Sequence, residues 1–162
     1  MHEERAAFED QFLAAAADDD WLGLQVYTCA RFDADGLVAP APELQTLAHG
    51  MEYRPQALGA AVTRAAEVLP GLPLLVTENG IATADDEQRI RFTTDALRSL
   101  SDAVAGGADV RGYVHWSLLD NFEWMLGYRP TFGLVQVDRE TFTRTPKPSL
   151  AWLGEVARRN GL

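Results

Sequence analysis

Residues 74–80 read LLVTENG, and the fold prediction begins from this segment. Its first four residues form an unbroken run of apolar and β-branched side chains, which is typical of a short strand buried on both faces of a parallel sheet. The Asn79-Gly80 pair predicts a turn directly after the strand. Glu78 therefore lies at the carboxyl end of the strand, which is the edge where parallel sheets carry their functional groups.

Helices and strands alternate on both sides of this stretch. Apolar residues recur at helical spacing before and after it, and two more strands, WLGLQVYT and VRGYVHWS, complete the alternation. This order indicates right-handed βα units, so the chain is predicted to be an α/β protein with a parallel sheet. The other predicted elements are a helix over 3–17, a strand over 21–28, a loop over 31–50, helices over 55–68 and 85–105 (capped by Thr83 or Asp85), a strand over 110–117, a loop over 118–131, a hairpin with arms 132–137 and 141–144, and a helix over 146–160.

The composition is that of one folded domain. The chain has 162 residues, of which 47% are apolar and 23% are charged, so residues 1–162 are expected to form a single domain. The formal net charge of −10 argues against binding to nucleic acid, because phosphate backbones would be repelled. The chain has a single cysteine, and its N-terminal segment MHEERAAFEDQF lacks the pattern of a signal peptide. Both observations favour a cytoplasmic location. No apolar run is long enough to predict a membrane span.

Neither a metal nor a cofactor is expected. The three histidines, His2, His49 and His115, lack metal-ligand spacing, and no glycine-rich phosphate loop occurs. Cys29 is interpreted as a small apolar residue after a strand, since no partner for a nucleophilic role is evident.

Glu78 is the first candidate for chemistry. A carboxylate at the mouth of a buried sheet is costly to desolvate unless it is hydrogen-bonded, although a solvated loop glutamate remains the alternative. Tyr27 lies near the end of the preceding strand, on the same face as Gln25. A phenol there can donate a hydrogen bond to a neighbouring carboxylate and influence its charge.

Residues 113–128 combine aromatic and acidic side chains. Trp116 and Trp124 bracket Asp120 and Glu123. Aromatic faces stack on the C–H faces of sugar rings and carboxylates accept paired hydroxyl hydrogen bonds, so this mixture is typical of a sugar site. A packed aromatic core with polar caps uses the same residue types, and composition does not separate the two interpretations.

Several motifs resemble glycoside hydrolase family 1, the family of retaining β-glucosidases, β-galactosidases and their relatives. The motifs are VTENG at 76–80, WSLLDNFEW at 116–124, GYRPTFGLVQVD at 127–138, TPKPSLAW at 145–152, GLQVYT at 23–28 and HGMEYRP at 49–55. The resemblance implies a (β/α)8 TIM barrel, of which this chain matches only strands six to eight with their helices, roughly the C-terminal third. It also implies a glycosidase of carbohydrate metabolism that hydrolyses O-glycosides.

The resemblance further implies roles for individual residues. Glu78 matches the nucleophile that forms the glycosyl-enzyme, and Tyr27 matches the tyrosine that hydrogen-bonds it. The substrate-binding candidates are Trp116, Glu123, Trp124, Phe132 and Asn79. Members that act on phosphorylated sugars replace the Glu123-Trp124 pair, so a non-phosphorylated β-glycoside is the expected substrate.

The sequence departs from the family pattern at several positions, which include Gln25, Val26, Met51 and Thr131. Gln25 stands where the family strand has an asparagine, and the T-[FL]-N-E-P motif that carries the acid/base carboxylate is not found in the 162 residues. Retaining hydrolysis uses two carboxylates ~5–5.5 Å apart, so the chain is expected to carry the nucleophile without the acid/base. Whether the isolated chain is an enzyme is therefore left open.

A partial barrel also leaves two edges of a parallel sheet unpaired, and such edges promote association. The chain is expected to pair with a second polypeptide that supplies the missing strands, to associate with itself, or to be a truncated product of low stability. The alternative functions are a non-catalytic sugar-binding or interaction module and a gene fragment without function.

Overall fold

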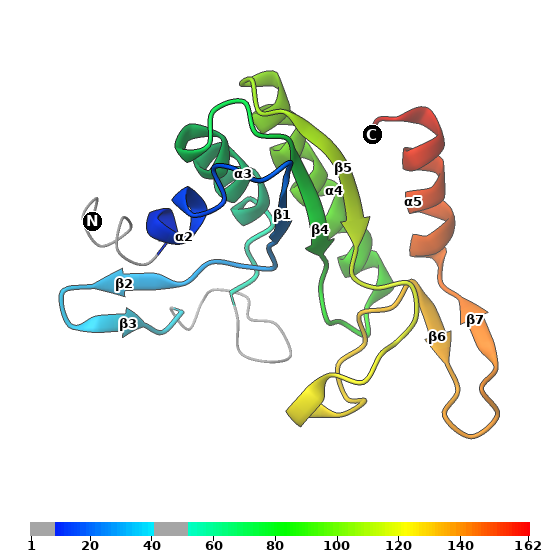
Figure 1. The fold of residues 1–162 in the computed structure, drawn as a ribbon. Coiled ribbons are helices and arrows are strands. Elements are labelled where there is room, and N and C mark those ends of the chain that lie inside the picture. The colour runs from blue at the N-terminus through cyan, green and yellow to red at the C-terminus, as the bar shows by residue number, and fades with distance from the viewer. Residues whose placement is uncertain (1–8, 41–51) are drawn as a thin grey trace.

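The computed structural model describes residues 9–40 and 52–162 (Figure 1). Its centre is a parallel sheet of three strands in the order β1-β4-β5. The strands are β1 (Leu22–Gln25), β4 (Leu74–Asn79) and β5 (Val110–His115). This sheet confirms the predicted α/β class, and residues 74–79 form its middle strand.

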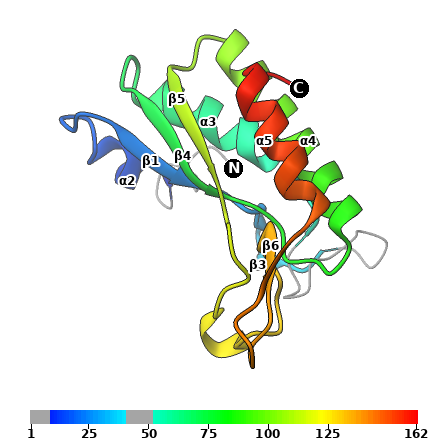
Figure 2. The same ribbon diagram turned by 90° about the vertical axis from the view of Figure 1, so that its right-hand side faces the viewer.

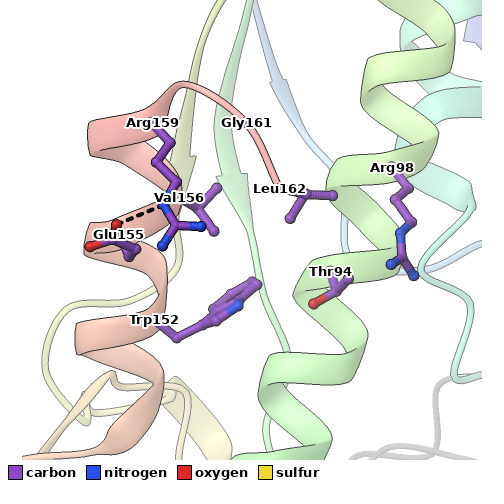
Figure 3. A pocket seen from close by; sticks show the side chains of 8 residues that line it. All are labelled: Thr94, Arg98, Trp152, Glu155, Val156, Arg159, Gly161 and Leu162. Carbon is purple, nitrogen blue, oxygen red and sulfur yellow. Dashed lines mark hydrogen bonds and ion pairs between the residues drawn. The ribbon is translucent and has the colours of Figure 1, made fainter.

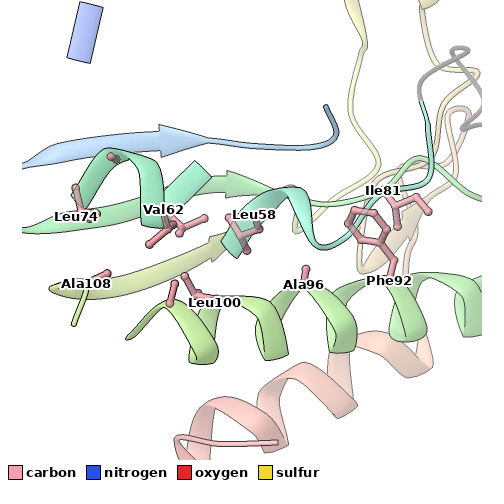
Figure 4. Close-up of a cluster of buried hydrophobic side chains, with 11 residues drawn as sticks. Leu58, Val62, Leu74, Ile81, Phe92, Ala96, Leu100 and Ala108 are labelled. Carbon is pink, nitrogen blue, oxygen red and sulfur yellow. The ribbon is translucent and has the colours of Figure 1, made fainter. Parts of the chain in front are cut away.

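Helices cover one face of this sheet, as Figure 2 shows. The helices α3 (Ala57–Val68) and α4 (Asp86–Ala105) enclose an apolar core against the strands. Gly59 lets the two helices approach closely, because a β-carbon there would lie 2.3 Å from the carbonyl oxygen of Ser99. The buried core includes Leu58, Val62, Leu74, Ile81, Phe92, Ala96, Leu100 and Ala108 (Figure 4).

The helix α4 begins and ends where the sequence predicts. The carboxylate of Asp85 accepts hydrogen bonds from the backbone N–H groups of Glu87 (3.0 Å) and Gln88 (3.2 Å), so Asp85 caps the helix. Gly106 is the residue at its C-terminal end. Of the two capping candidates, Thr83 instead accepts a hydrogen bond from the N–H of Asp85 through its hydroxyl oxygen (3.1 Å).

The prediction that the strand over 21–28 is buried on both faces is wrong. β1 is shorter, and its side chains alternate between partly buried leucines that pack on the core and the exposed Gly23 and Gln25. Val114 of β5 is also 51% exposed. The second face of the sheet is therefore open along both outer strands.

The segment 31–50, predicted as a loop, contains a short antiparallel hairpin. Its strands are β2 (Arg31–Asp33) and β3 (Gly36–Val38). Ala34 and Asp35 form the turn between Asp33 and its partner Gly36, and Gly36 has φ = +121°, a conformation that glycine adopts at little cost. The remainder of the predicted loop, from residue 41 through residue 50, lies outside the described residues.

The predicted helix over 3–17 lies only partly within the described residues, where it is shorter than predicted. Residues 1–8 lie outside the described part of the chain, and the regular helix α2 spans only Gln11–Ala14. Phe12 is 70% exposed, whereas Leu13 packs against the core. Of the two large apolar side chains in α2, Leu13 contacts the core and Phe12 does not.

The C-terminal part of the chain carries the loop that follows β5. This loop includes the short 3-10 helix η2 (Trp124–Leu126), and it leads to a hairpin of β6 (Val135–Val137) and β7 (Arg144–Pro146). The hairpin begins later than its predicted arms. The last helix, α5 (Pro148–Arg159), follows β7 with proline in its first turn, as predicted.

A buried network connects α4 to α5 and to the loop before β6. Asp86 accepts hydrogen bonds from the N–H (2.8 Å) and the hydroxyl (2.7 Å) of Ser149. Arg89, which is 1% exposed, donates to Asp86 and to the carbonyl oxygens of Thr83 and Thr131. The carboxylate and the two carbonyl groups offset much of the cost of burying Arg89, although its Nε has no partner within the described structure.

A cavity of about 280 Å³ opens between α4 and α5 (Figure 3). None of its lining residues is a candidate site residue; they are Thr94, Arg98, Trp152, Glu155, Val156, Arg159, Gly161 and Leu162. Among residues 9–40 and 52–162, no helix combines the length and the apolar character that crossing a membrane requires.

Candidate active site

Glu78 lies at the carboxyl end of β4, and two side chains from the β1 segment hold its carboxylate. Gln25 Nε2 donates to Glu78 Oε1 at 2.8 Å, and the Tyr27 hydroxyl donates to Glu78 Oε2 at 2.5 Å. Each carboxylate oxygen therefore has its own donor, and both donors come from one neighbouring strand segment. This geometry favours an oriented carboxylate over a freely rotating loop glutamate.

Tyr27 connects this carboxylate to Phe132. The two rings meet edge to face, with their centroids 5.9 Å apart and an interplanar angle of 74°. Burial, together with the hydrogen bond and charge of Glu78, raises the pKa of Tyr27 above its ordinary value. The phenol thus keeps its proton and remains a donor to Glu78 across the physiological pH range.

Trp116 follows β5 and is held at the end of β4 by its backbone. Its N–H donates to the carbonyl oxygen of Asn79 at 2.9 Å, and the Trp116-Ser117 peptide is cis. Gly80 makes this approach possible, because a β-carbon there would lie 1.9 Å from the carbonyl oxygen of Trp116. The structure therefore brings Trp116 to the same edge of the sheet as Glu78.

Glu123 belongs to the same region through electrostatics. Its carboxylate accepts a hydrogen bond from Asn121 Nδ2 at 2.6 Å, and its charge contributes to the raised pKa of Tyr27, after the larger effects of burial and Glu78. Trp124 is different, since its side chain is 81% exposed and its backbone φ is +46°. The structure thus brings together Glu78, Tyr27 and Phe132, keeps the charge of Glu123 within electrostatic range of Tyr27, and leaves the ring of Trp124 in solvent.

Asn79 is the candidate whose polar atoms are already used inside the chain. It is 1% exposed, its Nδ2 donates to the carbonyl oxygen of Val26 at 2.7 Å, and its Oδ1 accepts from the Tyr113 hydroxyl at 2.9 Å. Asn79 thus connects all three strands of the sheet at the level of Glu78.

A buried ion pair fixes the two ends of the loop that carries Glu123. The Asp120 carboxylate accepts from Lys147 Nζ at 2.9 Å and from the N–H of Gly133 at 2.9 Å, and Lys147 also donates to the carbonyl oxygen of Gly133 at 2.6 Å. A β-carbon on Gly133 would lie 2.2 Å from the backbone nitrogen of Asp120. Gly133 directly follows Phe132, so the pair places that ring as well as the loop.

Arg139, from the turn between β6 and β7, supports the same loop. Its Nη2 donates to the carbonyl oxygen of Asp120 at 2.6 Å, and its guanidinium carbon lies 4.1 Å from the ring centroid of Tyr128. The sequence analysis does not identify Lys147 or Arg139. Lys147 lies 27 residues and Arg139 lies 19 residues from Asp120 in the sequence, and no local sequence pattern indicates a contact over such a separation. Asp120 was marked only as part of the aromatic motif.

Glu52 forms a second buried carboxylate cluster, at the start of the segment that precedes α3. It is 3% exposed, and Arg31 donates to it twice at 2.8 Å. The hydrogen bond from Arg31 lowers the pKa of Glu52 below its ordinary value, in spite of burial. Within the described ranges, no group of three or more histidine, cysteine or acidic side chains has the geometry to hold a metal ion.

Solved structures that resemble this chain establish its class. A crystal structure of beta-glycosidase BGL167 superposes with a TM-score of 0.92 at 42% identity, and the match covers 99% of this chain but 38% of that protein. A beta-glycosidase from Pyrococcus horikoshii gives a TM-score of 0.86 at 33% identity, covering 97% of this chain and 42% of that one. The chain is therefore a part of a (β/α)8 barrel, as the motifs imply.

The sequence comparison identifies the family. The profile described as Glycosyl hydrolase family 1 matches residues 9–162. The chain belongs to glycosyl hydrolase family 1. "Thermostable beta-glucosidase B" of Thermobispora bispora is 39% identical over 163 residues, which cover 88% of this chain and 34% of that protein. The chain spans about a third of the length of the curated relatives it matches.

Proposed function

We propose that this chain forms the nucleophile-bearing wall of a retaining β-glycosidase active site, with Glu78 as the nucleophile. The observation that carries the proposal is the pair of donors on its carboxylate, Gln25 at 2.8 Å and Tyr27 at 2.5 Å. Family membership supports it, since the relatives include beta-glucosidases and beta-galactosidases. Two fixed donors orient the carboxylate toward one attack direction, which is what nucleophilic catalysis requires.

In this proposal the chemistry has two steps. A Glu78 oxygen bonds to the anomeric carbon while the bond from that carbon to the aglycone oxygen breaks, and the electron pair leaves with the aglycone. Water then attacks the anomeric carbon of the glycosyl ester, releases a proton to solvent and regenerates the Glu78 carboxylate. Tyr27 stays protonated throughout, because its raised pKa prevents ionisation at neutral pH.

The sugar would lie beside Glu78, between the side chains around that carboxylate and the solvent-exposed ring of Trp124. We assign the sugar-binding wall to Trp116, Glu123, Trp124 and Phe132, with a non-phosphorylated sugar as the ligand. The ring of Phe132 is buried against Tyr27, and the negative charge of Glu123 disfavours a phosphorylated sugar in the same region. Asn79 acts here through the strands and makes no sugar contact, because it is buried and both ends of its amide are bonded.

The acid/base carboxylate must come from outside these 162 residues, because no T-[FL]-N-E-P motif occurs in them. General acid catalysis contributes ~10²–10⁴-fold, so natural glycosides with poor leaving groups would be hydrolysed very slowly by this chain alone. An aryl glycoside with a good leaving group does not need that proton. The first step can then be observed without the missing carboxylate.

The test uses 2,4-dinitrophenyl β-glucoside and β-galactoside with the full chain. We expect a burst of dinitrophenolate of up to one equivalent per chain, followed by slower turnover, because the glycosyl ester lacks a base to assist its hydrolysis. Glu78→Ala abolishes the burst. The control is Glu87→Ala, which removes a glutamate that is 87% exposed on α4 and leaves the burst intact.

Two outcomes would contradict the proposal. The first is a burst that survives in the Glu78→Ala variant, and the second is rapid hydrolysis of cellobiose by the purified chain. Binding of glucose in a calorimetric titration with no burst in any variant would favour the non-catalytic sugar-binding module instead.

We also propose that another polypeptide segment, or a second copy of this chain, covers the outer edges of β1 and β5. Each has a neighbour on one side only within the described sheet, and the face that carries Gln25 and Val114 is exposed. Unpaired strand edges pair readily with other chains. Size-exclusion chromatography with light scattering should show dimers or larger species, and a monodisperse monomer at all concentrations would refute this part of the proposal.

A further inference from the structure

The middle strand of the sheet contains an irregularity at the candidate nucleophile. Along β1, Leu24 pairs with Val76 but the next residue, Gln25, pairs with Glu78. On the β5 side, Val76 pairs with Tyr113, and Asn79 pairs with His115. β4 therefore has one extra residue between Val76 and Glu78 relative to β1, and one extra residue between Val76 and Asn79 relative to β5, which is the definition of a β-bulge.

This bulge determines the direction in which Glu78 points. Leu74 and Val76 are fully buried in the core under α3 and α4. In a regular strand the side chains alternate, so Glu78 would point to the same side as these two residues and into the apolar core. The burial pattern along β4 instead breaks its alternation, with Thr77 and Glu78 both partly exposed and Asn79 buried. The extra residue turns the carboxylate to the open face, where Gln25 and Tyr27 meet it.

Side chains supply the hydrogen bonds that the irregular pairing leaves unmade. Thr77 Oγ1 donates to the carbonyl oxygen of Leu24 at 3.2 Å, and Asn79 Nδ2 donates to that of Val26 at 2.7 Å. On the other side, the Tyr113 hydroxyl donates to Asn79 Oδ1 at 2.9 Å. Three side-chain donors thus connect the bulge to both neighbouring strands. Thr77 and Asn79, on either side of Glu78, donate to the β1 segment, and Tyr113 of β5 donates to Asn79.

We propose that Thr77, Asn79 and Tyr113 are positioning residues for the nucleophile: together they hold the bulge that aims Glu78 at the open face. This inference rests on the proposed function, in which Glu78 is the reacting group. None of the three touches the sugar. Their effect passes through the direction of the Glu78 carboxylate, so they should influence the rate of glycosyl transfer and not the affinity for the sugar.

The test compares labelling of Glu78 by 2,4-dinitrophenyl 2-deoxy-2-fluoro-β-glucoside, followed by intact mass. Thr77→Val and Tyr113→Phe each remove one hydroxyl with little change of shape. A hydrogen bond is worth about 1 kcal/mol, so each variant should lower the labelling rate constant about fivefold at saturating probe, with an unchanged half-saturation concentration. Thr77→Ser, which keeps the hydroxyl, should restore the wild-type rate.

The matched control is Thr93→Val. Thr93 is 1% exposed in α4, and its hydroxyl has no hydrogen-bond partner within the described structure, so its removal should leave labelling unchanged. Circular dichroism at the labelling temperature confirms that each variant is folded. Labelling of Thr77→Val and Tyr113→Phe at the rate of Thr93→Val would overturn the inference.

A second measurement does not depend on catalysis. Tyrosine labelled with ¹³C at the hydroxyl-bearing carbon reports the Tyr27–Glu78 hydrogen bond, with Tyr27→Phe identifying the signal and Glu78→Gln showing its position when the carboxylate is lost. In Thr77→Val and Tyr113→Phe the Tyr27 signal should move toward the Glu78→Gln position. If it stays at the wild-type position, the inference is wrong. If the wild-type chain is not labelled but this signal moves, the proposed function fails and the positioning role of the bulge stands.

Discussion

Replacing Lys147 by methionine would leave one of the most buried carboxylates of the chain without its cation. The side chain of Asp120 is 6% exposed and that of Lys147 is 16% exposed, and their charged atoms lie 2.9 Å apart. Burial lowers the pKa of Lys147, although the hydrogen bond with Asp120 opposes this effect. Methionine preserves the length and apolar stem of the side chain, so the substitution removes the charge and two hydrogen bonds with little change of volume.

The expected cost is large. After the substitution, the Asp120 side chain keeps the N–H of Gly133 as its donor, and the carbonyl oxygen of Gly133 loses Lys147. Removal of one partner from a buried pair costs about 3–5 kcal/mol. For a chain of this size, 1 kcal/mol corresponds to about 2–4 °C, so the melting temperature should fall by roughly 6–20 °C.

Calorimetry and urea unfolding at neutral pH measure this cost. The control is Arg98→Met, which breaks an exposed pair with Asp95 and should cost ~1 kcal/mol or less. The double variant Asp120→Asn/Lys147→Met should be more stable than Lys147→Met alone, because it removes the unpaired buried charge. A Lys147→Met variant no less stable than Arg98→Met would refute the view that this pair fixes the loop.

Two other predictions concern His115 and Gly80. Burial, and then the charge of Arg89, lowers the pKa of His115 from 6.5 to about 4, so the unfolded chain binds a proton that the folded chain does not between these pH values. Stability should therefore fall as the pH is lowered, and His115 should account for about 3 kcal/mol of this loss between pH 7 and pH 4. In the His115→Asn variant the urea midpoint should depend less steeply on pH. An unchanged dependence on pH would contradict this prediction. Gly80→Ala should cost about 1–3 kcal/mol in thermal unfolding, because its β-carbon would meet the Trp116 carbonyl oxygen at 1.9 Å. Gly154→Ala in α5, with nothing within 4 Å, should instead be neutral or stabilising, and equal effects of the two would contradict the packing argument.

The parts of the fold that the sequence predicts are those set by local chemistry. The cap of α4 at Asp85 and its end at Gly106 follow from side-chain and backbone preferences of single residues. The hairpin at 31–38 could have been found by the same reasoning, since Asp35-Gly36 is a turn signal between two short β-prone stretches.

The parts that the sequence does not predict depend on strand pairing and distant contacts. The alternation of LLVTEN alone would turn Glu78 toward the core, and only the pairing with both neighbours reveals the extra residue. The partnership of Asp120 with Lys147 depends on how the hairpin returns to the loop, which no local pattern encodes. The motif resemblance led to Glu78 and Tyr27, and the structure adds Gln25 as the second donor.

The donors that orient Glu78, Gln25 and Tyr27, both belong to this chain, and so does the ring of Phe132 against Tyr27. A polypeptide that contributed the acid/base would therefore meet a carboxylate that is already oriented. On mixing the two, hydrolysis of a natural glycoside should appear with a rate proportional to the concentration of the added polypeptide. Encounter of the two chains, and not a slow internal step, would then set the time needed for activity to develop.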